Sequence, residues 1–250
     1  MTPKELIFAH RYSEAAKAYQ TLQLQHPEKN YHDALGEALL CLGRFSEAAS
    51  SFKKALEIES GRQKGNLAYL NQIGAALWLS GNKPGAMVEW HKAVSGILDG
   101  SSAYGDLAGG ATQGLLLWYG AVTLNDPQER EYALKYLQHL KRKKTYGRVL
   151  WPRPVFEMVL GEKSFAEILA EGIGSPDLGA CIQMTRSDLL KRRELCQALF
   201  YGACYEREAG NETECMSKMR ACFQLENPII EVEWYLARNE CGANSASAGS

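Results

Sequence analysis

The amino-acid sequence predicts an all-α protein, an irregular solenoid of about five helix pairs closed by a C-terminal capping helix. Three observations predict it. Small and aromatic residues recur at helical spacing, glycine-containing turns divide the helices, and the same helix–turn–helix pattern returns at similar intervals along the chain. At 250 residues the chain is long enough to bury a large core in such an arrangement.

The clearest unit spans Tyr31–Ser60. The first of its two helices, Tyr31–Leu42, is amphipathic, and the second follows a turn that begins at Gly43. The predicted buried face of the first helix consists of Leu35, Gly36 and Leu39, and that of the second consists of Ala48, Phe52 and Ala55. Small residues on both sides of an aromatic one let a neighbouring helix approach closely, so the segment predicts an antiparallel helical hairpin.

Two further copies of this unit complete residues 1–94, which we interpret as three regular repeats. The matching buried positions are Ala15, Tyr19 and Leu22 in the first copy and Ile73, Gly74, Leu77, Ala86, Trp90 and Ala93 in the third. Ala15 to Ala48 is 33 residues and Ala48 to Ala86 is 38 residues. This spacing and these positions resemble the tetratricopeptide repeat (TPR), a 34-residue helical hairpin. The resemblance implies a stacked array of hairpins with a concave binding face.

Residues 95–114 are rich in Gly, Ser and Ala, which is typical of a flexible linker. The apolar residues Ile97, Leu98, Tyr104 and Leu107 equally favour a loop packed over the repeats. Residues 115–241 are then expected to hold degenerate and C-terminal TPR-like hairpins, and residues 242–250 a disordered tail.

Within residues 115–241, several local signals define helices. Leu115–Leu124 is apolar enough for a buried helix, and Pro127 fits the first turn of the next one. Ser164 and Glu167 form a capping-box pattern, and Glu171–Gly179 is expected to be a loop. The remaining predicted core positions are Ala133, Leu137, Leu140, Cys215, Met219, Cys222, Val232, Tyr235 and Leu236.

The segment Trp151–Gly161, with two prolines, interrupts the helical rhythm before the last repeat. Together with the apolar Leu115–Tyr119 and the closing Phe200–Gly202, it resembles a bacterial branch of TPR adaptor proteins that includes periplasmic lipoproteins. The N-terminal residues Met1–Gln20 carry charges and no apolar stretch, so no secretory signal is expected here. The envelope location of that branch is therefore not transferred to this chain.

Charge and cysteine content narrow the class of function. The formal net charge is −1, which favours neither nucleic acid nor a membrane surface as a partner. No apolar run approaches the roughly 20 residues that span a bilayer. Seven cysteines at irregular spacings indicate reduced, structural thiols, so we expect a cytoplasmic protein. The basic run Lys141–Lys144 is interpreted as charge at a helix C-terminus, and a nuclear-import or phosphate-binding role is the alternative.

No nucleophile, phosphate-loop or paired-acid motif is present in the sequence, and no His lies near a cysteine pair at metal-ligand spacing. We therefore expect no enzymatic activity, no cofactor and no metal site.

A partner-binding groove follows from the TPR resemblance. Mapped onto that pattern, the first helices of the second and third repeats line the concave face with Asn30, Asp33, Glu37, Leu40, Asn71, Ala75 and Trp78. In this hypothesis Asn71 clamps a peptide backbone, Asp33 and Glu37 select a basic partner, and an exposed Trp78 is the apolar anchor. The alternative is that residues 95–114 fold over the groove and cover Trp78.

The predicted function is a non-catalytic adaptor or scaffold that binds a segment of another protein, with no nucleic acid and no membrane as partner. An immunity or inhibitor protein that occludes a cognate toxin or enzyme is the alternative. A sensor that binds a peptide or small ligand is a third interpretation. The sequence specifies no oligomeric state.

Overall fold

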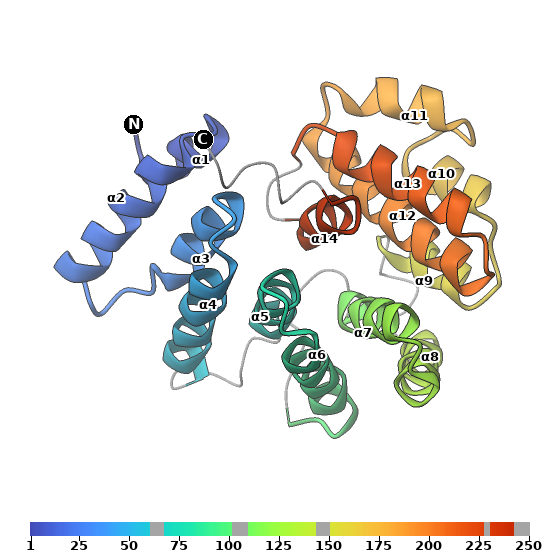
Figure 1. The fold of residues 1–250 in the computed structure, drawn as a ribbon, viewed down its shortest axis with the longest axis horizontal. Helices are drawn as coiled ribbons and strands as arrows, with labels where there is room; N and C mark the ends of the chain where they lie inside the picture. Colours follow the sequence, from blue (N-terminus) through green and yellow to red (C-terminus); the bar gives the residue numbers. More distant parts are fainter. Residues whose placement is uncertain (61–67, 102–109, 144–150, 228–230, 243–250) are drawn as a thin grey trace. The chain divides into compact units, whose positions relative to one another are not determined.

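A computed structural model describes residues 1–60, 68–101, 110–143, 151–227 and 231–242 of the chain. These residues form fourteen helices and no strand, which confirms the predicted all-α class (Figure 1). The chain divides into two compact units, Met1–Gly105 and Asp106–Ser250. Predictions for 102–109, 144–150, 228–230 and 243–250 lie outside the described residues.

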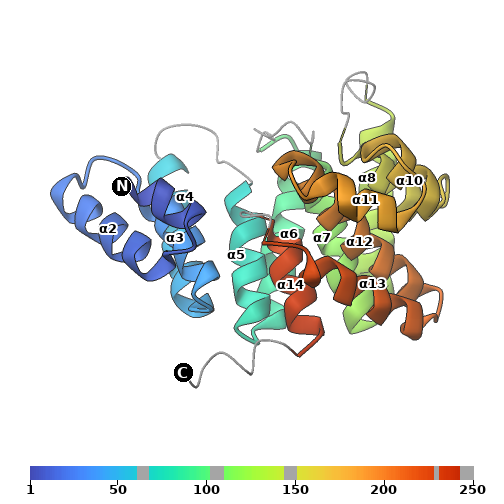
Figure 2. The same ribbon diagram turned by 90° about the horizontal axis from the view of Figure 1, so that it is seen from above.

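The first unit contains six helices, and each packs against the helix before it in the chain (Figure 2). They are α1 (Pro3–Phe8), α2 (Tyr12–Gln25), α3 (His32–Cys41), α4 (Phe45–Ser60), α5 (Ala68–Leu79) and α6 (Lys83–Leu98). The predicted hairpins correspond to α3–α4 and α5–α6. Helix α1 is an additional short helix, started by a capping box between Thr2 and Glu5.

Two glycines let the paired helices of this unit approach closely. A Cβ atom at Gly36 on α3 would lie 2.5 Å from the Phe52 ring on α4, and one at Gly74 on α5 would lie 2.3 Å from Trp90 Nε1 on α6. Both aromatic side chains are fully buried. The predicted burial of Gly36, Phe52, Gly74 and Trp90 is therefore confirmed, and a larger side chain has no room at either glycine.

The second unit contains eight helices, with α12 packed against six of the others. They are α7 (Ala111–Leu124), α8 (Pro127–Lys141), α9 (Arg153–Val159), α10 (Phe165–Gly172), α11 (Leu178–Thr185), α12 (Leu189–Glu208), α13 (Glu212–Gln224) and α14 (Val232–Glu240). Its longest pairing runs between α12 and α13, which lie side by side (Figure 1).

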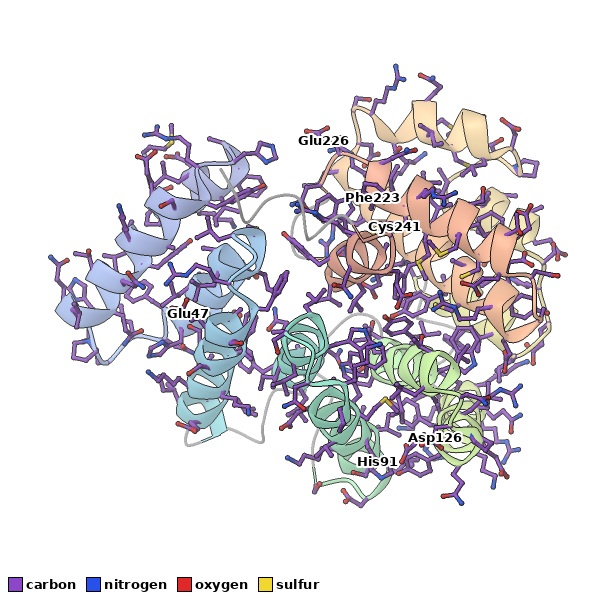
Figure 3. All side chains as sticks on the ribbon, in the orientation of Figure 1. Glu47, His91, Asp126, Phe223, Glu226 and Cys241 are labelled. Atoms are coloured by element: carbon purple, nitrogen blue, oxygen red, sulfur yellow. The ribbon has the colours of Figure 1, made fainter. Side chains whose placement is uncertain are left out.

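Two helix starts in this unit follow the expected chemistry. Asp126 Oδ1 accepts hydrogen bonds from the backbone N–H groups of Gln128 and Glu129, both at 3.0 Å, at the start of α8 (Figure 3). The Ser164–Glu167 capping box at the start of α10 is confirmed. In each case a side-chain oxygen accepts hydrogen bonds from backbone N–H groups of the first helical turn, which have no partner within the helix.

Three boundaries differ from the expectation. Helix α6 extends to Leu98 and α7 begins at Ala111, so both ends of the Gly-rich segment 95–114 are helical. Helix α11 occupies residues 178–185, whereas a loop was expected up to Gly179 and no helix until Asp188. Asp177 caps α11 by accepting a hydrogen bond from the N–H of Ala180 at 2.7 Å, and this cap stabilises a short helix in a segment of weak periodicity.

The predicted core positions Cys215, Met219 and Cys222 are all fully buried between α12 and its neighbours. All seven cysteines are free thiols. In the described parts of the chain, each helix is too short or too polar to span a lipid bilayer.

Candidate functional site

The seven predicted groove residues all belong to the first unit, on or just before α3 and on α5, but they divide into two groups. Asn30, Asp33 and Glu37 are half-buried and reach solvent. The other four are buried, with exposed fractions of 5% for Leu40, 7% for Asn71, 0% for Ala75 and 1% for Trp78. The three residues on or just before the start of α3 are therefore accessible to solvent, and the other four belong to the interior of the first unit.

The prediction of an exposed Trp78 is wrong. Its ring lies 5.5 Å from the ring of Trp90, with an angle of 32° between their planes, and Lys83 Nζ lies 5.0 Å from its centroid. Helix α5 packs between α4 and α6 and is apolar on nearly every side, so its periodicity does not identify a solvent face. Leu77, expected in the core, is the half-exposed neighbour.

Three carboxyl groups of the first unit, Asp33, Glu37 and Glu59, form what we call the acidic cluster. Asn30 links the start of α3 to the end of α4, because its Nδ2 donates to Glu59 Oε1 at 3.3 Å and to the carbonyl oxygen of Ala55 at 3.4 Å. Asp33 Oδ1 is buried and has no hydrogen-bond partner among the described residues. The cluster thus contains a carboxylate oxygen that the described fold leaves unsatisfied.

The charges of this cluster act on the groups around it. Burial raises the pKa of Asp33, and the neighbouring charge of Glu59 raises it further. Burial together with the charges of Asp33 and Glu59 raises the pKa of Tyr69, on α5, to about 12. The pKa of Tyr19, on α2, is raised by burial and then by Glu37 and Asp33. Negative potential therefore accumulates where α2, α3, α4 and α5 meet.

Among the described residues of the first unit, no Lys, Arg or His side chain forms an ion pair with Asp33. His32, next to it, has a pKa lowered by burial and by Lys54, which favours the neutral imidazole. The arginines near the other ends of these helices pair elsewhere, Arg11 with Glu14 and Arg44 with Glu47, each at 2.6 Å.

Glu59 and Tyr69 were not among the predicted site residues. One signal in the sequence could have pointed to Tyr69, which lies 38 residues after Tyr31, the same offset as between Ala48 and Ala86. Glu59 sits near the end of α4, where no repeat position marks it, and only the packing of the helices brings it to Asp33.

A separate cavity of about 370 Å³ opens in the second unit, between the α7–α8 turn and the end of α12. Its lining residues are Ala121, Val122, Asn125, Asp126, Pro127, Arg130, Arg207 and Glu208. Both arginines are already paired: Arg130 with Glu208, and Arg207 with Glu212 at 3.2 Å and Glu240 at 3.1 Å. Its charges are therefore balanced internally, and it offers an anion no free cation in the described residues.

The cysteines of the second unit are poor candidates for chemistry. Cys196 Sγ lies 3.5 Å from Cys222 Sγ, and both side chains are fully buried. Burial raises the pKa of the Cys196 and Cys204 thiols well above the ordinary value, so little reactive thiolate forms. Among the described residues, no three His, Cys, Asp or Glu side chains are placed to hold a metal ion.

Comparison with models of known protein families and with curated protein sequences found no match for this chain.

Proposed function

We propose that the first unit is a non-catalytic protein-binding module that holds a basic segment of a partner protein against the acidic cluster. The observation that carries this proposal is the half-buried carboxylate of Asp33, whose Oδ1 has no partner in the described fold. A Lys or Arg side chain supplies the donors and the positive charge that this oxygen lacks.

The surroundings favour a protein segment as the ligand. Tyr69 and Tyr19 are close enough to the carboxyl groups for their charges to raise the pKa of each phenol. A long basic side chain brings both an aliphatic stem and a charged end to such a mixed aromatic and acidic setting. Trp78 has no direct part in this proposal, because its side chain is buried in the core of the first unit. Asn71, whose Oδ1 is buried and unpartnered, lies too deep for a first contact.

We further propose that the protein works in the reducing cytoplasm. The presence of seven free thiols, two of them 3.5 Å apart, supports this location.

The test is affinity purification of the tagged full chain from its native host, comparing the wild type with Asp33→Asn/Glu59→Gln. This double variant removes two charges of the cluster and keeps the shape of both side chains. Glu14→Gln/Glu47→Gln is the matched control, because it removes two negative charges from the same unit at exposed ion pairs. We expect one partner that is lost with the first variant and retained with the control.

The partner found with the wild type is then shortened to its basic segment. The affinity of the protein for this peptide is measured at increasing salt concentrations. A contact between charges should weaken as the ionic strength rises, since added salt screens exposed charges. A partner that binds both double variants equally would contradict the proposal. If the partner is an enzyme that loses activity on binding, the module acts as an inhibitor and not as an adaptor.

A further inference from the structure

The second unit contains a buried pair of carboxyl groups, Glu231 and Glu233, at the start of α14. Glu231 is the residue immediately before the helix, and Glu233 lies in its first turn. Their exposed fractions are 5% and 1%. Two carboxyl groups removed from water this completely are stable only with hydrogen bonds and a compensating charge or proton.

Helix α12 provides the partners of this pair. Arg193 forms an ion pair with Glu231, and Tyr201 donates its hydroxyl to Glu233 Oε1 at 2.8 Å. Gln197 Nε2 lies between them, 2.8 Å from Glu231 Oε2 and 3.5 Å from Glu233 Oε1. The contacts of one face of α12 thus hold both carboxyl groups.

The orientation of the Gln197 amide is fixed from its other side. Trp151 Nε1 lies 2.7 Å from Gln197 Oε1. An indole nitrogen can only donate, so the atom it meets is the amide oxygen, and the amide N–H₂ group must face the carboxyl pair. The donors that surround the pair are therefore well defined.

The pair itself requires one more proton. Glu231 Oε2 and Glu233 Oε1 both lie within reach of one donor, Gln197 Nε2, so the two carboxyl groups are neighbours in the same buried setting. Two ionised carboxylates this close repel each other where water does not screen them, so we infer that one of the two is protonated.

The charge balance agrees with this requirement. The charged and titratable groups that act most strongly on the pair are Arg193, Tyr201 and the Cys196 thiol, all on α12. Burial keeps the thiol and the phenol neutral by raising the pKa of each well above its ordinary value. One positive charge therefore faces two carboxyl groups. Burial and the charge of Glu231 raise the pKa of Glu233 to about 8.

We propose that α14 is a proton-dependent latch: one proton shared by Glu231 and Glu233 holds the start of this helix on α12, and loss of the proton releases it. The far end of α14 is held differently. Glu240 accepts a hydrogen bond from the Tyr119 hydroxyl at 2.8 Å and pairs with Arg207 at 3.1 Å, and neither contact needs a shared proton. Alkaline conditions thus open the first turn while the last turn stays attached.

The direction of the pH dependence follows from linkage. The pair binds one proton more in the folded chain than in the unfolded chain between the ordinary pKa of Glu, 4.5, and about 8. Its contribution to stability is therefore complete below 4.5 and is lost as the pH rises to about 8. Over this range the unfolding equilibrium constant should rise by up to about tenfold per pH unit.

The first experiment compares the urea unfolding of the wild type and Glu233→Gln between pH 5.5 and 9. Glutamine reproduces the protonated acid, because its Oε1 can accept from Tyr201 and its Nε2 can donate to Glu231. We expect the ratio of the two unfolding constants to rise up to about pH 8 and then to level off. Glu131→Gln, at an exposed pair with Lys135, should leave the pH dependence of the wild type unchanged. A ratio that is constant across this range would overturn the proposal.

The second experiment needs no variant. Hydrogen exchange of the wild-type amides is followed at pH 6.5 and pH 9 and corrected for the intrinsic exchange rate. We expect the first turn of α14 to lose protection at pH 9 by tenfold or more relative to α13, with the end of α14 changing less. Equal protection of α14 at both pH values would show that the start of this helix does not depend on the proton.

Discussion

The two units of this protein differ in how far the hydrogen bonds of their buried carboxyl groups are satisfied. In the first unit, Asp33 is half-buried, carries a neighbouring negative charge from Glu59, and has a carboxylate oxygen without a partner in the described fold. In the second unit, Glu231 and Glu233 are more deeply buried, yet Arg193, Gln197 and Tyr201 bind them. Depth of burial alone therefore does not separate structure from function. We propose that hydrogen bonding does, because a partly exposed carboxyl group with an unsatisfied oxygen can accept a hydrogen bond from a partner.

The largest effect is expected in the core of the first unit. Trp78→Ala should destabilise this unit by about 3–5 kcal/mol, because it removes a fully buried ring whose centroid lies 5.5 Å from that of Trp90. Urea unfolding followed by circular dichroism measures the loss, and Trp90→Ala should cost a similar amount. If Trp78→Ala lost partner binding without losing stability, Trp78 would be the exposed binding residue that the sequence predicted and not a core residue.

The next largest effect is expected from the hydrogen bonds that Gln197 forms with the Glu231–Glu233 pair of the second unit. Gln197→Leu should cost about 3 kcal/mol, since Trp151 loses its acceptor and both glutamates lose a donor in a buried setting. Gln128→Leu, at an exposed position on α8, is the matched control and should change stability by less than about 0.5 kcal/mol. Equal costs for the two variants would mean that the hydrogen bonds of Gln197 do not stabilise the fold.

A smaller cost is expected for Tyr201→Phe, which removes one hydrogen bond to Glu233. We expect a loss of about 1–2 kcal/mol, because a buried carboxyl group keeps its other contacts. The Tyr201 hydroxyl lowers the pKa of Glu233, so its removal raises that pKa. The decline of stability with pH should then continue above the wild-type limit of about 8, and titration of stability against pH measures this shift. A decline that ends at the same pH in both proteins would contradict it.

Most helices of both units could be predicted from the sequence, because the signals that define them are local. The Ser164–Glu167 box and the buried faces that contain Gly36 and Phe52 each depend on a few residues of one helix. Short helices such as α11 were missed, since eight residues give little periodicity. The TPR resemblance stays a prediction.

The candidate site was only half predictable, for a physical reason. Asp33 and Glu37 were assigned to the groove by the TPR resemblance, and both reach solvent on α3. The face of α5 could not be read in this way, because apolar residues surround it, and Trp78 was assigned to the wrong side. Glu59 and Tyr69 reach Asp33 only through the packing of α4 and α5, which no local pattern encodes.

The smallest expected effect is a gain in stability, whereas the preceding variants lose stability. It distinguishes the carboxyl group of Asp33 from the hydrogen-bonded pair of the second unit. Asp33→Asn should raise the stability of the first unit at pH 7, on the order of 0.5 kcal/mol, because it removes a charge that burial and Glu59 disfavour. The pKa of Asp33 is raised, so its contribution to stability is complete below 3.8 and is lost as the pH rises through the native pKa. The gain in the variant should therefore grow from pH 3.5 to pH 7, as urea unfolding across this range can measure. Partner binding should weaken in the same variant, since the carboxylate that destabilises the free chain is the one we assign to recognition. A variant that is both less stable and equally able to bind would place Asp33 among the structural acids, with Glu231 and Glu233.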